Sequence, residues 1–404
     1  MRVSIISVSI VWMLWLTACK QSPQLSFGKE EILSNTETIG SCPYITQTPT
    51  GKTVVSWVEQ TGSATLGTLH YRVLTGDTEQ TVNIPTADSI LPHAENMPKI
   101  IFQPNGHMIA MFGRESNDPR NKYAGKVFYT QSFDNGKTWE AAQPLVTDTA
   151  SYDQRYFDMA LLPNGEVAAV WLDNRKHTTH EGSSLYFATT QGKQGFQGEH
   201  AIGETICQCC RTKLLVDAQG AIHVAFRDIV QDTIRDMAHI LSTDNGQTFS
   251  PPVRISTDNW VVRGCPHTGP TMVQNAKGLH FAWFTMGGGE GVFFCSSFTN
   301  GNTYTQKENI SNVEGAKHPQ LGVLSDNKML LVWDEMVPNK TGNNRIGIQL
   351  KNENGTTIYA GNMSADTGFT SFPVLRAYEH KAVVAYKRKE GTLESVCVQT
   401  VTCL

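Results

Sequence analysis

An eight-residue pattern that occurs twice constrains the fold of this chain more than any other feature. The pattern is S-x-D-x-G-x-T-[W/F], and its copies are residues 132–139 and 242–249. A third copy, 297–304, has Thr299 in place of the aspartate. Asn-Gly pairs tolerate positive φ, and Ser and Asp side chains hydrogen-bond to nearby backbone amides, so each copy predicts a tight turn between two strands. The closing aromatic residue is expected to pack against a neighbouring sheet.

This pattern resembles the Asp-box, or BNR repeat, of sialidases and related β-propellers. The whole mature chain is similar to sialidase-like, Asp-box propeller lipoproteins. In the families that it resembles, the box lies away from the active site. The resemblance therefore implies an all-β propeller fold, and it implies less about chemistry.

A longer repeat agrees with that fold. A short apolar strand, a polar turn and an apolar strand ending in an aromatic residue recur about every 50 to 60 residues, the length of a four-stranded antiparallel blade. The copies are 42–57, 97–112, 157–171, 210–226, 269–283, 318–333 and 372–386. Seven blades are therefore favoured, with six, the usual number in sialidases, as the alternative. The last copy leaves room for about three strands, so we expect residues 25–39 to add the missing strand and close the ring.

The N-terminus reads as an export signal. Arg2 precedes an apolar run, and Leu16-Thr17-Ala18-Cys19 resembles a bacterial lipobox. We expect residues 1–18 to be a lipoprotein signal peptide, 19–26 a lipidated Cys19 with a tether, and 27–404 one propeller domain. Lys20 resembles an outer-membrane address, which predicts a lipid-anchored protein of the bacterial cell envelope. An ordinary cleaved signal or a short anchor helix is the alternative.

The composition argues against a nucleic-acid partner. The 404 residues include 33 Lys and Arg against 37 Asp and Glu, a net charge of −4, with no basic tail or stripe. A nucleic-acid partner is therefore not expected. The membrane is expected to be reached only through the lipid anchor.

Cysteines gather at one place in the repeat. The first positions of the repeated strands, which would crowd one mouth of a propeller channel, hold mainly soft ligands: Cys42, Met97, Asp158, Cys209, Cys210, Cys265 with His267, and His318. Nine cysteines less Cys19 leave eight, and an even number in an exported protein favours disulfides.

Two other interpretations of these cysteines stay open. Cys207, Cys209, Cys210, Cys265 and His267 would suit a Cu or Zn site. Redox-active thiols are the third interpretation.

Arginine and aspartate form the second cluster of candidates. These residues follow the second strands of the repeats or begin the next strand, and the candidate catalytic set is Asp173, Arg175, Arg227, Asp228, Arg235 and Asp236. Arginine binds carboxylates bidentately, and paired carboxylates serve glycoside chemistry. The alternative is that these pairs only tie adjacent strands together.

The sialidase resemblance implies three arginines on the substrate carboxylate, a Tyr–Glu pair and an aspartate acid/base. The Arg-Ile-Pro motif that supplies the first arginine is missing, because the corresponding positions read Cys42-Pro43-Tyr44 and Met97-Pro98-Lys99. The favoured function is a glycan-acting hydrolase, exo-sialidase-like, on acidic sugars, a reaction that requires no cofactor. The alternatives are a non-catalytic surface propeller that binds glycan or protein, and a metal-binding propeller.

Overall fold

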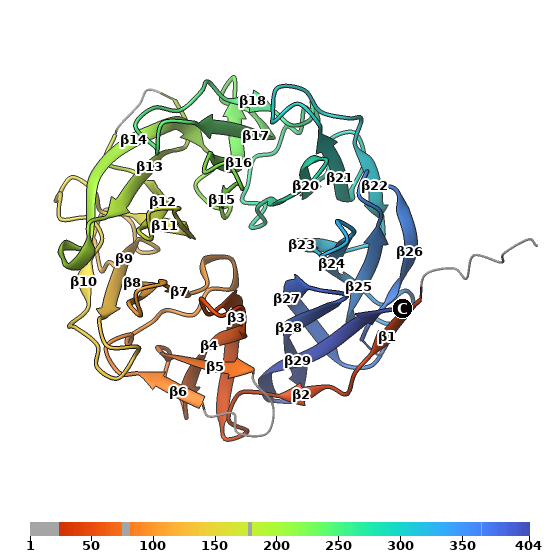
Figure 1. Cartoon of the computed structure of the whole chain (residues 1–404), viewed down its shortest axis with the longest axis horizontal. Coiled ribbons are helices and arrows are strands. Elements are labelled where there is room, and N and C mark those ends of the chain that lie inside the picture. The colour runs from red at the N-terminus through yellow and green to blue at the C-terminus, as the bar shows by residue number, and fades with distance from the viewer. Residues whose placement is uncertain (1–23, 75–80, 177–179, 365) are drawn as a thin grey trace, which may run out of the picture.

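The computed structural model describes residues 24–74, 81–176, 180–364 and 366–404, and in these the chain is an all-β protein. Helical structure in the described ranges is confined to two short 3₁₀ segments, η1 (Ala94–Asn96) and η2 (Gly192–Gln194). Strand groups follow one another around a common centre (Figure 1). The predicted all-β, propeller-like fold is thereby confirmed. None of the described helices is long and apolar enough to cross a membrane.

The strands pair almost entirely antiparallel, in three four-stranded sheets, one eight-stranded and one nine-stranded sheet. In the two larger sheets the pair Ile206–Asp228 and the parallel pair Asn344–Phe369 link consecutive groups of up to four strands. The first groups are β3 (Thr38–Gln47), β4 (Thr53–Thr61), β5 (Thr68–Leu74), β6 (Thr81–Ile84); β7 (Lys99–Phe102), β8 (Met108–Glu115), β9 (Gly125–Ser132), β10 (Gln143–Pro144); and β11 (Gln154–Leu161), β12 (Val167–Asp173), β13 (Ser183–Thr190), β14 (Phe196–Ile206). The next are β15 (Lys213–Val216), β16 (Ile222–Val230), β17 (Ile234–Ser242), β18 (Val253–Arg254); and β19 (Thr271–Asn275), β20 (Gly278–Thr285), β21 (Gly291–Ser297), β22 (Glu308–Ser311). The last are β23 (Lys317–Val323), β24 (Met329–Met336), β25 (Asn344–Lys351), β26 (Thr357–Asn362); and β27 (Phe369–Tyr378), β28 (Lys381–Glu390), β29 (Leu393–Cys403).

The two ends of the chain share a sheet. Strands β1 (Leu25–Phe27) and β2 (Glu31–Ile32) both pair antiparallel with β29. In Figure 1 the red β1 accordingly lies beside the blue C-terminal strands. The first strand thus begins at Leu25, two residues before the predicted domain start at 27, because its backbone pairs with residues 401–403. The predicted signal peptide and Cys19 lie outside the described residues.

The repeated octapeptides are the turns that their sequence predicts. Asn135 and Gly136 have φ of 61° and 80°. Ser132 Oγ accepts a hydrogen bond from Gly136 N at 2.9 Å, and Asp134 accepts from Thr138 N at 2.9 Å and from its hydroxyl at 2.6 Å. The 242–249 copy repeats these bonds. In the third copy the Thr299 hydroxyl replaces the carboxylate as acceptor for Thr303 N.

The core lies between neighbouring strand groups. One hydrophobic cluster combines β4, β5, β7 and β8, with Trp139 of the first octapeptide packed against it. Phe249 and Tyr304 pack in the same way on two further clusters. The predicted packing of the closing aromatic residues is therefore confirmed, and the apolar area that each removes from water stabilises the fold.

A bulge recurs where several innermost strands begin. Cys42, Tyr156, His318 and Phe372 have positive φ of 52–54°, and the strand register shifts at each of them. A non-glycine residue in this region carries strain, and bulges re-aim side chains beside functional sites. The bulges therefore mark the mouth of the ring where the sequence places its candidate site.

Candidate functional site

A pocket of about 850 Å³ opens at this mouth. Its lining comes from the segment before β7, the β8–β9 connection, the start of β11, and the segments around Gln208 and Cys265. Residues far apart in the sequence thus meet in one cavity, which is the usual form of a small-molecule or glycan site.

Two neutral groups in contact lie in the pocket wall. The rings of His93 and Tyr156 meet edge to face with centroids 5.7 Å apart, and His267 lies 6.1 Å from His93. Burial lowers the pKa of His93 and raises the pKa of Tyr156. His93 Nδ1 is buried and has no hydrogen-bond partner in the described part of the chain. At neutral pH the pair is therefore an unprotonated imidazole beside a protonated phenol.

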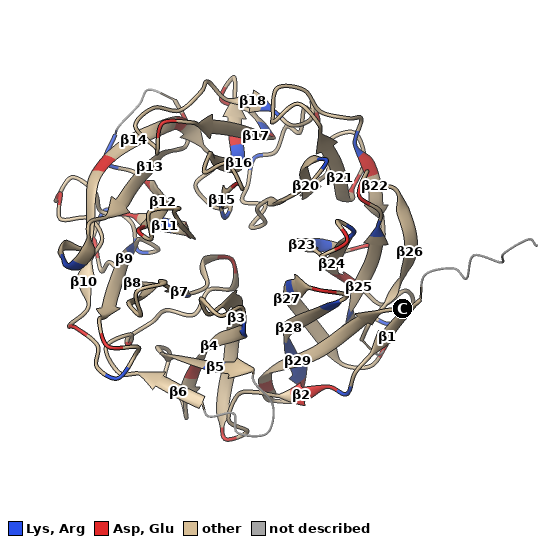
Figure 2. Cartoon of the chain, in the orientation of Figure 1, with Lys and Arg blue, Asp and Glu red and all other residues tan. Residues whose placement is uncertain are grey.

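Charged groups of both signs also line the pocket. Arg155 binds Asp153 bidentately, with Nε–Oδ1 at 2.6 Å and Nη2–Oδ2 at 2.5 Å. Arg114 pairs with Asp88, and its guanidinium lies 4.8 Å from the centroid of the Phe128 ring. Around the whole ring, acidic and basic residues are interspersed (Figure 2). The pocket therefore offers cations held in place by carboxylates.

The rim of the pocket carries an exposed aromatic ring. Tyr123 is 69% exposed, with the ammonium of Lys122 lying 4.8 Å from its ring centroid. Such a ring offers a ligand a broad apolar face and a hydroxyl group at its edge.

A buried ion pair fastens the segment that carries His93. Glu95 of η1 accepts from Arg211 Nη1 at 2.7 Å and from Gly269 N at 3.1 Å. Arg211 also donates to the carbonyl oxygen of Pro319 at 3.1 Å. These contacts join η1 to the segments just before β15 and β19 and to β23 itself, so they fix the positions of His93 and Asn96 in the pocket.

Three of the predicted metal-site cysteines converge beside the pocket. Cys207 Sγ lies 3.5 Å from Cys209 Sγ and 3.8 Å from Cys210 Sγ. Hydrogen bonds from the other two thiols lower the pKa of Cys207 well below its usual range. Cys209 also lines the pocket, as do Cys265 and His267.

The structure differs from the favoured disulfide interpretation. All eight described cysteines are free. The sulfur separations in the cluster are also far beyond the S–S bond length of about 2.05 Å.

The predicted Arg227, Arg235 and Asp236 lie in the interior, and none of them lines the pocket in the described chain. Arg227 donates to the carbonyl oxygens of Arg235, Thr268 and Phe284. Arg235 pairs with Glu181 at 2.5 Å. Asp236 pairs with Arg254 and accepts backbone N–H groups of residues 259 and 260.

The carboxylate of Asp173 makes a contact with a tryptophan that recurs in two other strand groups. Its carboxylate accepts the indole N–H of Trp171 at 3.1 Å and binds Arg175. Glu59 and Glu335 accept the indole N–H of the tryptophan two residues before them in the same way. These contacts lie within one strand and the residues directly after it. A tie between adjacent strands, the alternative interpretation, is seen instead where Asp236 on β17 pairs with Arg254 on β18.

Asp228 is half-buried on β16 and accepts from the Thr205 hydroxyl at 3.2 Å, and burial raises its pKa. Neither it nor Asp173 or Arg175 is among the described pocket-lining residues.

Sequence reasoning missed His93, Arg155 and Tyr156. It selected the first positions of the inner strands, such as Met97 and Asp158, but the bulge at Tyr156 brings the residues just before them into the pocket. A signal available in the sequence was that all three lie within four residues before the repeat copies at 97 and 157.

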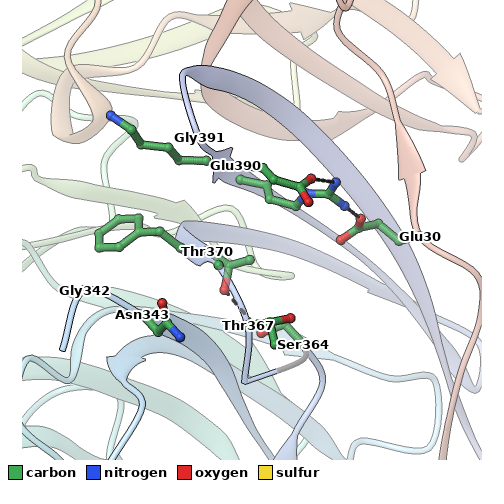
Figure 3. A pocket seen from close by; sticks show the side chains of 12 residues that line it. Glu30, Gly342, Asn343, Ser364, Thr367, Thr370, Glu390 and Gly391 are labelled. Atoms are coloured by element: carbon green, nitrogen blue, oxygen red, sulfur yellow. Dashed lines mark hydrogen bonds and ion pairs between the residues drawn. The ribbon is translucent and has the colours of Figure 1, made fainter. Parts of the chain in front are cut away.

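A second pocket, of about 540 Å³, lies beside the N-terminal segment. Glu30 and Glu390, which lie close together in Figure 3, both pair with the guanidinium of Arg388. Ser364 and Thr370 are hydrogen-bonded at 3.2 Å on the opposite wall. Among the described residues that line this pocket, the one arginine is already bound by two carboxylates, and none is a histidine or tyrosine.

No family model matches this chain, and no curated protein does either. A protein of unknown function from Dyadobacter fermentans DSM 18053 superposes with a TM-score of 0.57 at 14% identity, covering 94% of this chain and 99% of that one. Polysaccharide lyase Uly1 superposes with a TM-score of 0.55 at 11% identity, covering 91% of each chain. Sialidases are also among the matches, for example the microbial sialidase Hz136 at 15% identity, 87% and 76% coverage and a TM-score of 0.49. The first two superpositions show a shared fold.

Proposed function

We propose that this protein is an exported glycan-acting enzyme, and that the 850 Å³ pocket is its active site for an acidic sugar. The observation that carries the proposal is the contact of His93 with Tyr156 beside Arg155 in a cavity rimmed by the exposed Tyr123. The likeness to a polysaccharide lyase supports the fold on which such a site is built.

The two neutral groups have complementary roles. At neutral pH the unprotonated imidazole of His93 is in the form that accepts a proton, and the protonated phenol of Tyr156 is in the form that donates one. Arg155 and Arg114 supply positive charge for a sugar carboxylate.

This set favours cleavage by elimination. His93 removes the proton from the carbon that bears the carboxylate, and the electron pair forms a carbon–carbon double bond as the glycosidic C–O bond breaks. Tyr156 protonates the departing oxygen. An arginine stabilises the negative charge that develops on the carboxylate.

Exo-sialidase-like hydrolysis is the second candidate. Tyr156, Arg155 and Asp153 together in the pocket are residue types that the sialidase resemblance implies. Burial works against a tyrosinate nucleophile, because it disfavours the charged form. For that reason elimination is the favoured reaction and hydrolysis the second candidate.

The test uses the soluble form that begins at Lys20, with uronate polysaccharides and sialylated glycans as substrates. Elimination produces an unsaturated sugar that absorbs in the near ultraviolet, and hydrolysis releases free sialic acid. Tyr156→Phe and His93→Gln should each lower turnover by about 10²–10⁴-fold. Asp228→Asn, outside the pocket, is the matched control and should retain activity. Tight binding without turnover would indicate a binding protein instead. The proposal would be refuted if the protein neither bound nor cleaved any of these glycans.

For the architecture, we propose a seven-bladed ring. Support comes from six successive four-stranded groups and from β27–β29, which β1 and β2 complete.

For location, we propose lipidation of Cys19 and anchoring in the outer membrane of a bacterial envelope, on the strength of the lipobox-like string and Lys20. Mass spectrometry of the N-terminal peptide tests this, because an unlipidated Cys19 would contradict it.

A further inference from the structure

The geometry points to a binding site for a soft closed-shell metal ion, Cu(I) or Zn(II), formed by the sulfurs of Cys207, Cys209 and Cys210. This site goes beyond the glycan chemistry proposed above and does not depend on it.

The sulfur spacing fits one metal ion. The Sγ atoms of Cys209 and Cys210 lie 3.5 and 3.8 Å from that of Cys207, and all three lie within 4.8 Å of one another. A Zn–S bond of about 2.3 Å places two sulfurs of a tetrahedron about 3.8 Å apart. Thiolate sulfur is also the ligand that Cu(I) and Zn(II) prefer.

The backbone holds the three cysteines together. They follow β14 in a turn where Cys210 N donates to Cys207 O at 3.4 Å. Cys207 N donates to Arg227 O of β16 at 2.9 Å, which ties the turn to a central strand. The three side chains are only 1%, 4% and 1% exposed. The ligand set is therefore assembled before any ion arrives.

A buried cation beside the cluster lacks a counter-charge. Arg227 is 1% exposed and has no ion pair with a carboxylate in the described part of the chain. Its hydrogen bonds go to three carbonyl oxygens, and its Nε is buried without a partner.

Burying a guanidinium without an opposing charge is costly. Three thiolates around Cu⁺ or Zn²⁺ leave a net negative charge, which balances Arg227.

The site has one open side. Cys209 faces the pocket, as do the exposed Cys265 and His267. The segment that carries these two is held near the cluster, because Thr268 O accepts from Arg227 at 3.2 Å. Neither Cys265 nor His267 lies within 4.8 Å of all three sulfurs in the described structure, so this segment has to move closer to supply the fourth ligand that Zn(II) favours. Cu(I) is satisfied by the three sulfurs alone.

The experiment uses the form that begins at Lys20, reduced and purified without oxygen. Zn(II) and Cu(I) are each titrated against a chromophoric chelator, with native mass spectrometry and thiol alkylation as independent readouts. One metal ion per chain should bind, and it should protect Cys207, Cys209 and Cys210 from alkylation.

Variants separate the ligands from other cysteines. Cys209→Ser and Cys210→Ser should each weaken binding by more than about 100-fold, since even a second-shell change costs about 10–100-fold. Cys295→Ser, at a buried thiol on β21 outside the cluster, is the matched control and should bind as the parent does.

Whether binding depends on a fourth ligand distinguishes Zn(II) from Cu(I). A Cys265→Ser/His267→Ala double variant should weaken Zn(II) binding and leave Cu(I) binding intact. Tyr156→Phe should leave the affinity for either ion unchanged, which separates this proposal from the glycan site. Absence of stoichiometric metal from the reduced protein, or equal binding by the Cys209→Ser variant and the parent, would overturn the site.

Discussion

Removing the carboxylate of Glu95 should be among the most damaging single changes in the ring. Glu95 and Arg211 have side chains only 2% and 7% exposed, and their atoms meet at 2.7 Å. Glu95→Gln leaves the guanidinium of Arg211 buried without a counter-ion. Breaking such a pair from one side costs about 3–5 kcal/mol, because the remaining charge is desolvated and unpaired.

The assay is equilibrium urea unfolding at neutral pH, followed by tryptophan fluorescence. The exposed pair Lys328–Asp326, with side chains 38% and 52% exposed, is the matched control. Asp326→Asn should cost about 0–1 kcal/mol, because solvent screens that pair.

A double variant tests the cause. Glu95→Gln combined with Arg211→Met removes both charges, so it should lose less stability than the sum of the two single variants. Additive losses, or a Glu95→Gln effect no larger than that of Asp326→Asn, would refute the reasoning. Because η1 carries His93, the single variant should also impair any activity of the pocket.

Three further predictions concern the turns and the N-terminal strands. Hydrogen bonds from Thr248 lower the pKa of Asp244 to about 2, so its contribution to stability is present above its ordinary pKa near 3.8 and is lost as the pH falls toward 2. Asp244→Asn should remove that part of the acid transition in circular dichroism, and an unchanged transition would contradict it. Gly246→Ala places a Cβ 2.3 Å from Phe187 at a φ of +83°, and it should cost about 1–3 kcal/mol more in urea unfolding than Gly51→Ala, which has φ of +80° and nothing within 4 Å. A form beginning at Leu33 lacks β1 and β2, so it should melt lower and associate through β29 in size-exclusion chromatography, whereas an unchanged monomer would argue against edge protection.

The fold could be predicted from the sequence because its turns and strands depend on residues that are close together along the chain. Turn formation at 132–139 depends on hydrogen bonds within eight residues, so the sequence predicts it fully. The inner strands are equally local, because alternation and bounding turns are properties of contiguous residues. Cys207, Cys209 and Cys210 stand close enough in the sequence to predict that they meet.

Contacts between strand groups could not be predicted from contiguous residues. An Arg–Asp pair has the same sequence whether it faces a ligand or a neighbouring strand, and only the structure shows Asp173 binding an indole N–H in the interior. His93 and Tyr156 are 63 positions apart, and a bulge decides that their rings touch.

The sequence by itself therefore determined the kind of sheet, the repeat and the cysteine cluster, because these depend on neighbours along the chain. The tertiary structure alone decided which groups share the pocket and which charges are paired. Those relations are set by how successive sheets pack around one axis, and no short stretch of sequence contains that information.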